Sequence, residues 1–195
     1  MKKTLFILLL GISFVTPTYS QIEQITIRWT AQLCQGTCPK LIVNELKKVQ
    51  GIDEIFIDQG SGQAILTWKE KMPFQFTSIN TAMRMVGISM RDIRIKVRGT
   101  VKHTGDVFYI ISEGDNSRFD LLSPVTPIPY GQTSEYNTLT RKISPAFRQQ
   151  FLDAETQELI ATVEGPVFMP ERKTVPTQIV VDTLSFSEPK AVLKK

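Results

Sequence analysis

The sequence predicts an α+β protein in two parts, the first with the element order β-α-β-β-α-β and the second made mainly of short strands. Three observations support this. Apolar and polar residues alternate in several segments, two stretches before residue 87 carry apolar residues at helical spacing, and turn residues separate strand-like runs after residue 99. A hydrophobic content of 42% in 195 residues fits a folded chain.

The first twenty residues have the pattern of a secretory signal peptide. Lys2 and Lys3 form a short basic start, residues 5–15 are apolar but too few to span a bilayer, and residues 18–20 place small side chains at the cleavage positions. We therefore expect residues 1–20 to be removed, and the mature protein to be periplasmic or secreted and not embedded in a membrane. A retained signal anchor is the alternative.

The net charge argues against a nucleic-acid partner. The whole chain carries +4, and removal of Lys2 and Lys3 leaves 21 basic residues against 19 acidic ones, a net charge of +2. Nucleic-acid binding domains have a much stronger basic excess. We therefore expect no nucleic acid among the partners of the exported protein.

The first folded segment is predicted to be a strand, a cysteine-bearing loop and a helix. Residues 25–30 alternate apolar and polar side chains, as in a half-buried strand. The only two cysteines, Cys34 and Cys38, follow, and Pro39 suits the first turn of a helix because its missing N–H has no intrahelical partner there. The apolar stripe of this helix is predicted to comprise Leu41, Leu46 and Val49, with Ile42 or Val43.

A hairpin, a second helix and a strand complete the first part. Residues 54–58 and 63–69 are predicted strands around a glycine-containing turn. Thr77 or Ser78 is expected to cap the second helix, and residues 88–97 alternate again as a strand. The stripe of the second helix is predicted to comprise Ile79, Ala82, Met83 and Val86.

The element order of residues 21–97 is that of a ferredoxin-like domain. Within it, the chain resembles the heavy-metal-associated family of copper chaperones and metal-transporting ATPases over roughly residues 23–97. The resemblance is carried by the cysteine pair between strand and helix, Gly51-Ile52, Asp58, Ser61-Gly62 and Gly87. It implies a soft metal ion, usually copper(I), held by Cys34 and Cys38, and a metal-delivery protein as partner. The spacing here is C-x-x-x-C where the family has C-x-x-C, and Gln32 stands where the family has methionine.

The second part is predicted to be a small barrel. Residues 99–103, 107–112 and 118–122 are expected strands, a loop over 123–137 leads to a helix that starts near Pro145, and two further strands are expected over 159–164 and 177–186. This order resembles the OB-type barrel, with its helix between the third and fourth strands. We therefore place an OB-like domain at residues 98–186 and a flexible tail at 187–195; an open β-sandwich is the alternative.

The two parts are predicted to share a strand. Residues 88–103 keep a strand pattern that would extend about 53 Å at roughly 3.3 Å per residue, longer than an ordinary strand. A shared or bent strand would make a stiff rod of two domains. The alternative is a short bend near Arg98 and Gly99 between loosely connected domains.

Three interpretations of Cys34 and Cys38 remain open. Thiolates select soft metals, and two ligands suit linear copper(I) but not a closed zinc site, which needs four. In an oxidising compartment the same pair favours a disulfide, which would stabilise little because the closed loop is short. Thiol–disulfide exchange at a helix N-terminus is the third interpretation, although the C-x-x-C spacing of thioredoxins is absent.

No other residues form a recognisable catalytic set. His103 is the only histidine, and no serine lies in a nucleophile motif, so we expect a protein that is not an enzyme. Phe108, Tyr109 and Phe119 are expected to belong mainly to the core rather than to a nucleic-acid surface. A protein partner on the barrel is the more plausible interaction.

The sequence thus predicts an exported, non-enzymatic protein that binds a soft metal ion through Cys34 and Cys38. The alternative is an exported protein-interaction scaffold with a degenerate metal site and a Cys34–Cys38 disulfide, whose partner binds the barrel. A thiol–disulfide redox module is the third hypothesis.

Overall fold

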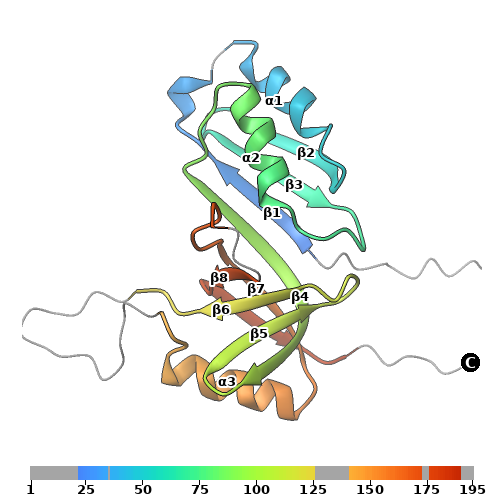
Figure 1. Ribbon diagram of the computed structural model, residues 1–195, viewed down its shortest axis with the longest axis vertical. Helices are drawn as coiled ribbons and strands as arrows, with labels where there is room; N and C mark the ends of the chain where they lie inside the picture. Colours follow the sequence, from blue (N-terminus) through green and yellow to red (C-terminus); the bar gives the residue numbers. More distant parts are fainter. Residues whose placement is uncertain (1–21, 35, 126–140, 173–175, 190–195) are drawn as a thin grey trace, which may run out of the picture.

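The protein is a mixed α+β molecule, described by a computed structural model over residues 22–34, 36–125, 141–172 and 176–189. Within these residues, nine strands form one curled sheet that is accompanied by three α-helices (Figure 1). The predicted signal peptide, most of the predicted loop 123–137 and the end of the predicted tail lie outside the described residues. No helix of the described part is long and apolar enough to cross a membrane.

The first part contains four strands, with two helices on one face of the sheet (Figure 1). Its strands pair antiparallel in the order β2-β3-β1-β4. The elements are β1 (Ile22–Arg28), α1 (Cys38–Leu46), β2 (Ile52–Asp58), β3 (Gln63–Trp68), α2 (Phe76–Met85) and β4 (Asp92–Thr104).

Strand alternation separates the two faces of this sheet. Ile25 pairs with Leu66 on one side and with Ile95 on the other, and all three side chains are fully buried. Residues directly opposite each other in an antiparallel ladder point to the same face, so this row forms the floor beneath the helices. The helices cover it with their own buried residues, which are Ile42 and Leu46 of α1 and Ile79, Ala82 and Met83 of α2.

Two details of the predicted helices are wrong. Leu41 is 50% exposed, because successive residues turn by about 100° and Leu41 therefore lies outside the stripe that Ile42 shares with Leu46. The second helix starts at Phe76 and not after Thr77 or Ser78, since Phe76 packs against the core and fixes the first turn.

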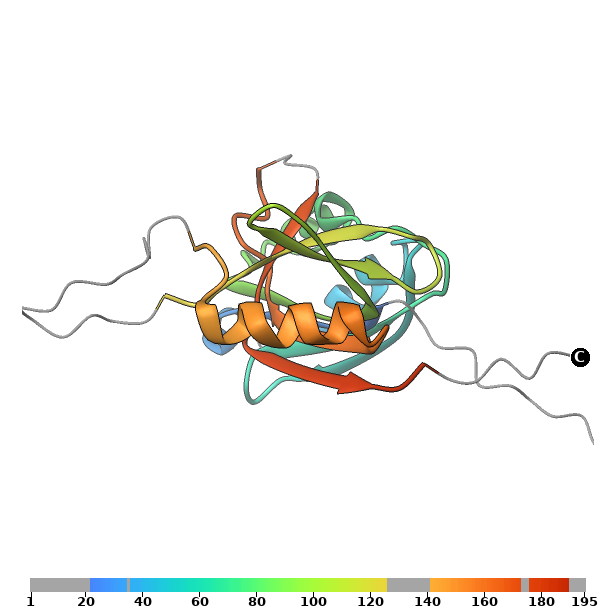
Figure 2. The ribbon, with the colours of Figure 1, turned by 90° about the horizontal axis from the view of Figure 1, so that it is seen from below.

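The second part curls its strands into a half-barrel with a helix across one end (Figures 1 and 2). β4, β5 and β6 form an antiparallel meander, β8 runs parallel to β6, and β7 lies antiparallel to β4 with β9 on its other side. The elements are β5 (Val107–Ser112), β6 (Arg118–Leu122), α3 (Pro145–Thr156), β7 (Ile160–Pro166), β8 (Thr177–Val180) and β9 (Thr183–Ser187). The predicted last strand is therefore two strands with different partners.

β4 is the strand that joins the two parts, as the long alternating pattern predicts. It starts at Asp92 rather than at residue 88 and runs for 13 residues. Its residues 94–97 pair with β1 on one side and β7 on the other, and residues 99–104 pair with β5. The buried side chains likewise form one continuous cluster, from Ile42 of α1 to Phe151 of α3.

Two glycines allow the sheet to curl tightly. A Cβ atom on Gly99 would lie 1.9 Å from the carbonyl oxygen of Ile111, and one on Gly165 would lie 1.7 Å from the carbonyl oxygen of Val180. Backbone from another strand therefore occupies the space that any side chain would need at these two positions. Such glycines are typical of places where strands bend sharply around a barrel.

Candidate functional site

The two cysteines come together where α1 begins. Cys34 ends the short 3₁₀ helix η1 (Ala31–Leu33), and its N–H donates to the carbonyl oxygen of Ala31 at 3.1 Å. Cys38 is the first residue of α1. The two Cα atoms are 5.2 Å apart, and the sulfur atoms are joined in a disulfide. The loop thus places the predicted pair side by side at the helix N-terminus.

The disulfide determines what this pair can bind. Cys34 is 1% exposed and belongs to the core, while Cys38 is partly buried against it. Soft metals bind thiolates, so Cys34 and Cys38 can ligate a metal only after their bond is reduced. Across the described residues, no three histidine, cysteine, aspartate or glutamate side chains gather where they could hold an ion.

The lone histidine links the half-barrel to its helix. Nδ1 of His103 lies 2.5 Å from Oε2 of Glu155, whose other oxygen is 3.7 Å from Nζ of Lys102. The imidazole also stacks on Phe108, with 5.5 Å between ring centres. These contacts connect β4 and β5 with α3.

The basic residues of β4 are paired within the fold. Arg94 contacts Asp182 at 2.7 Å, Lys96 contacts Glu23 at 2.9 Å, and Arg98 contacts Glu113 at 3.1 Å; these six residues come from four separate stretches of chain. Phe108 and Phe119 are buried in the core, as expected, whereas Tyr109 is only partly buried and its ring stacks under the guanidinium of Arg118 at 3.9 Å. The parts that could have formed a nucleic-acid surface are therefore used in packing and ion pairs.

One acidic side chain at the barrel has its ionisation altered by its neighbours. Asp106, in the turn between β4 and β5, accepts hydrogen bonds from Arg148 of α3 at 3.0 Å and from Lys142 at 3.4 Å. The hydrogen bond from Arg148 and then that from Lys142 lower the pKa of Asp106 below its usual range. The carboxylate thereby ties the β4–β5 turn to the N-terminal half of α3.

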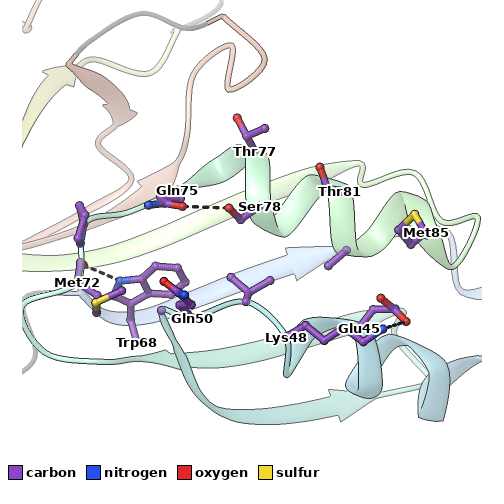
Figure 3. A pocket seen from close by; sticks show the side chains of 14 residues that line it. Glu45, Lys48, Gln50, Trp68, Met72, Gln75, Thr77, Ser78, Thr81 and Met85 are labelled. Atoms are coloured by element: carbon purple, nitrogen blue, oxygen red, sulfur yellow. Dashed lines mark hydrogen bonds and ion pairs between the residues drawn. The ribbon is translucent and has the colours of Figure 1, made fainter.

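A cavity that was not predicted lies between the two helices of the first part. It has a volume of about 520 Å³ and lies between the end of α1 and the length of α2 (Figure 3). We call it the α1–α2 groove. Trp68, Met72 and Gln75 lie at one end, and Glu45 and Met85 lie at the other.

The groove is formed by residues from three separate segments. Most of the lining residues on and just before α2 recur every three or four positions and so share one face of the helix. These are Gln75, which precedes the helix, and Ser78, Thr81, Ala82 and Met85 of α2; Thr77 also lines the groove. Sequence periodicity could have identified this stripe, but the opposite wall depends on how α1 and β3 pack, which no local pattern records.

Comparison with protein-family models, curated proteins and solved structures finds no match for this chain.

Proposed function

We propose that the protein is an exported, non-enzymatic interaction scaffold in which a disulfide replaces a metal site. The proposal joins a ferredoxin-like part at residues 21–97 to an OB-like barrel at residues 98–186. The strand order β2-β3-β1-β4 with both helices on one face supports the first assignment. The second is supported by the parallel pairing of β6 with β8 and by a helix between β6 and β7.

The observation that carries the proposal is the bond between Cys34 and Cys38. A metal-transfer loop needs two free thiolates that an incoming ion and a partner protein can reach. Here the sulfurs are bonded to each other and Cys34 is almost completely buried. The pair therefore suits a fixed connection between η1 and α1 better than an exchange site.

The continuous strand β4 supports a scaffold role. Both parts share its backbone hydrogen bonds and one hydrophobic core, so their surfaces keep a fixed relative orientation. A rigid support lowers the entropic cost of binding a partner, because few groups need to be ordered when the complex forms. The N-terminal pattern of the sequence supports export.

Determination of the N-terminus and a count of free thiols test the proposal. The full chain is exported from a bacterial host, its N-terminus is determined by mass spectrometry, and its free thiols are counted in denaturant. We expect removal of the first twenty residues and no free thiol. A chain that retains its leader, or that carries two free thiols after aerobic purification, would contradict this proposal.

Binding of a soft metal after reduction is the second candidate function. It is favoured by the 5.2 Å separation of the Cα atoms, which keeps the two thiols within reach of a single ion after reduction. Copper(I) is titrated into the reduced protein against a chromogenic chelator, with Cys34→Ser as the matched control. Sub-nanomolar binding that the control loses would establish metal binding and displace the scaffold proposal. Insulin reduction by the protein would instead indicate a redox module.

A further inference from the structure

We propose that the α1–α2 groove binds a short, extended, uncharged peptide segment that inserts one apolar side chain between the helices. The inference rests on the scaffold proposal and assigns it a binding surface that neither the cysteines nor the barrel residues line. Its support comes from the length of the groove, its floor, its rim and its charge.

The length of the groove suits a few residues of extended chain. Its wall on α2 runs from Gln75 to Met85, which is about 15 Å at a rise of 1.5 Å per residue. An extended peptide advances about 3.3 Å per residue, so four to five residues fill this length. The volume of about 520 Å³ lies within the usual range for binding pockets, roughly 300–1,000 Å³.

The floor is apolar and closely packed. Trp68 is 3% exposed, and its indole N–H donates to the carbonyl oxygen of Met72 at 2.8 Å, which fixes the ring. Gly51 lies against that ring so closely that a Cβ there would be 2.0 Å from a ring carbon. With Ala82 on the facing helix, Trp68 and Gly51 give the groove a rigid apolar floor against which an apolar side chain can pack.

The rim can adjust to the side chain that enters. Met85 is 73% exposed at one end of the groove, and Met72 lies near the other end (Figure 3). Methionine side chains are unbranched and polarisable, so they pack against apolar groups of different shapes. This arrangement favours recognition of an apolar side chain without demanding one particular shape.

Neutral polar groups along the groove match a peptide backbone. Gln50 and Gln75 each carry an amide donor and an amide acceptor, and Ser78 and Thr81 add hydroxyl groups. Ser78 already donates to Oε1 of Gln75 at 3.0 Å, which orients that amide (Figure 3). A main chain presents alternating N–H and C=O groups, which need partners of both kinds.

The charges of the groove cancel. Its two charged residues, Glu45 and Lys48, form an ion pair at 2.6 Å, so the lining offers a bound ligand no net charge. A charged side chain brought into this site would lose water without gaining a counter-charge. The bound segment is therefore expected to be uncharged.

The binding test uses five-residue peptides with blocked ends. Leucine, methionine, lysine or glutamate occupies the centre, with serine and glycine around it, and binding to the oxidised full chain is followed by NMR. We expect the leucine and methionine peptides to give saturable shifts at the Trp68 indole and the Gln50 and Gln75 amides. The lysine and glutamate peptides should bind at least tenfold more weakly.

Two variants on α2 localise the binding. Thr81→Phe places a large ring at the groove, whereas Arg84→Phe places the same ring at an exposed position of α2 that does not line it. Both variants are first checked for unchanged circular dichroism and melting temperature. We expect Thr81→Phe to weaken binding at least tenfold and Arg84→Phe to change it less than twofold.

Several results would overturn the groove assignment. These are the absence of saturable shifts with every peptide, equal binding of the charged peptides, equal effects of the two phenylalanine variants, or saturation only by a long amphipathic helix. None of these results affects the outcome of the thiol count or of the copper titration, which test the scaffold proposal. Failure of the groove proposal can therefore be distinguished from failure of the scaffold proposal.

Discussion

At the scale of single residues, Asp106 shows how one carboxylate can connect two elements. It lies in the β4–β5 turn and receives hydrogen bonds from Arg148 and Lys142, on or just before α3. Because folding lowers the pKa of Asp106, the folded protein stabilises the ionised carboxylate relative to the unfolded chain. Its contribution to stability is complete above the unfolded pKa of about 3.9 and is lost as the pH falls through the lower folded value.

Replacement of Asp106 by asparagine should therefore have an effect that depends on pH. We expect Asp106→Asn to lower the melting temperature at pH 7, by a few degrees, and this difference to shrink below about pH 4 as the wild-type carboxylate is protonated. Melting curves from pH 2 to pH 8 measure it, with Asp53→Asn, at an exposed position of β2, as the control. A difference that does not change with pH would contradict the assigned role of the carboxylate.

At the scale of elements, the sequence predicts segments with a clear period better than segments shaped by their partners. The alternation in residues 25–30 and 93–97 identifies strands whose buried face is as predicted, as Ile25 and Ile95 show. Leu41 is misplaced because a run of adjacent apolar residues does not by itself determine which of them face inward. The predicted strand 177–186 divides at residues 181–182, where the chain passes from β8 beside β6 to β9 beside β7.

The cysteine loop could be predicted only in part. The sequence places both cysteines at the start of a helix, and the separation of four residues allows a bond. Whether the two sulfurs can bond depends on how η1 turns the chain, which brings the Cα atoms to 5.2 Å. The α1–α2 groove was beyond sequence reasoning because Trp68, Gly51 and Ala82 meet only through packing.

Gly99 provides a test at the scale of the strand pair β4–β5. In Gly99→Ala, the added methyl would meet the backbone of Ile111, which cannot move aside as a side chain could. We expect a loss of about 3 kcal/mol in the free energy of unfolding, at the upper end of overpacking effects. Urea denaturation measures it, with Thr100→Ala on the same strand as the control. Equal losses in the two variants would show that the close approach at Gly99 is unimportant.

At the scale of the whole molecule, the shared strand should make the two parts unfold together. Residues 94–97 of β4 hold β1 on one side and β7 on the other, and the buried cluster is continuous through both parts. Separating the parts would expose core residues and break ladder hydrogen bonds at the same time. The molecule is therefore expected to behave as one cooperative unit.

Native-state hydrogen exchange can measure this coupling. The slowest amides of β1, such as Ile25, and of β5, such as Ile110, should open with the same free energy and the same dependence on urea. Slowly exchanging amides that report two distinct free energies, one for each part, would indicate independent folding. Amides in the described turns should exchange faster through local opening and serve as internal references.

Because β4 pairs with β1 on one side and β7 on the other, the protein cannot be cut into two separate domains without exposing a strand edge. A cut after residue 97 would leave the first part with an outer strand stripped of β7, and hence with a row of open backbone donors and acceptors. Such exposed strand edges recruit other strands and promote aggregation. The folded part of the chain is therefore best produced and crystallised undivided, with any fusion placed at its C-terminal end.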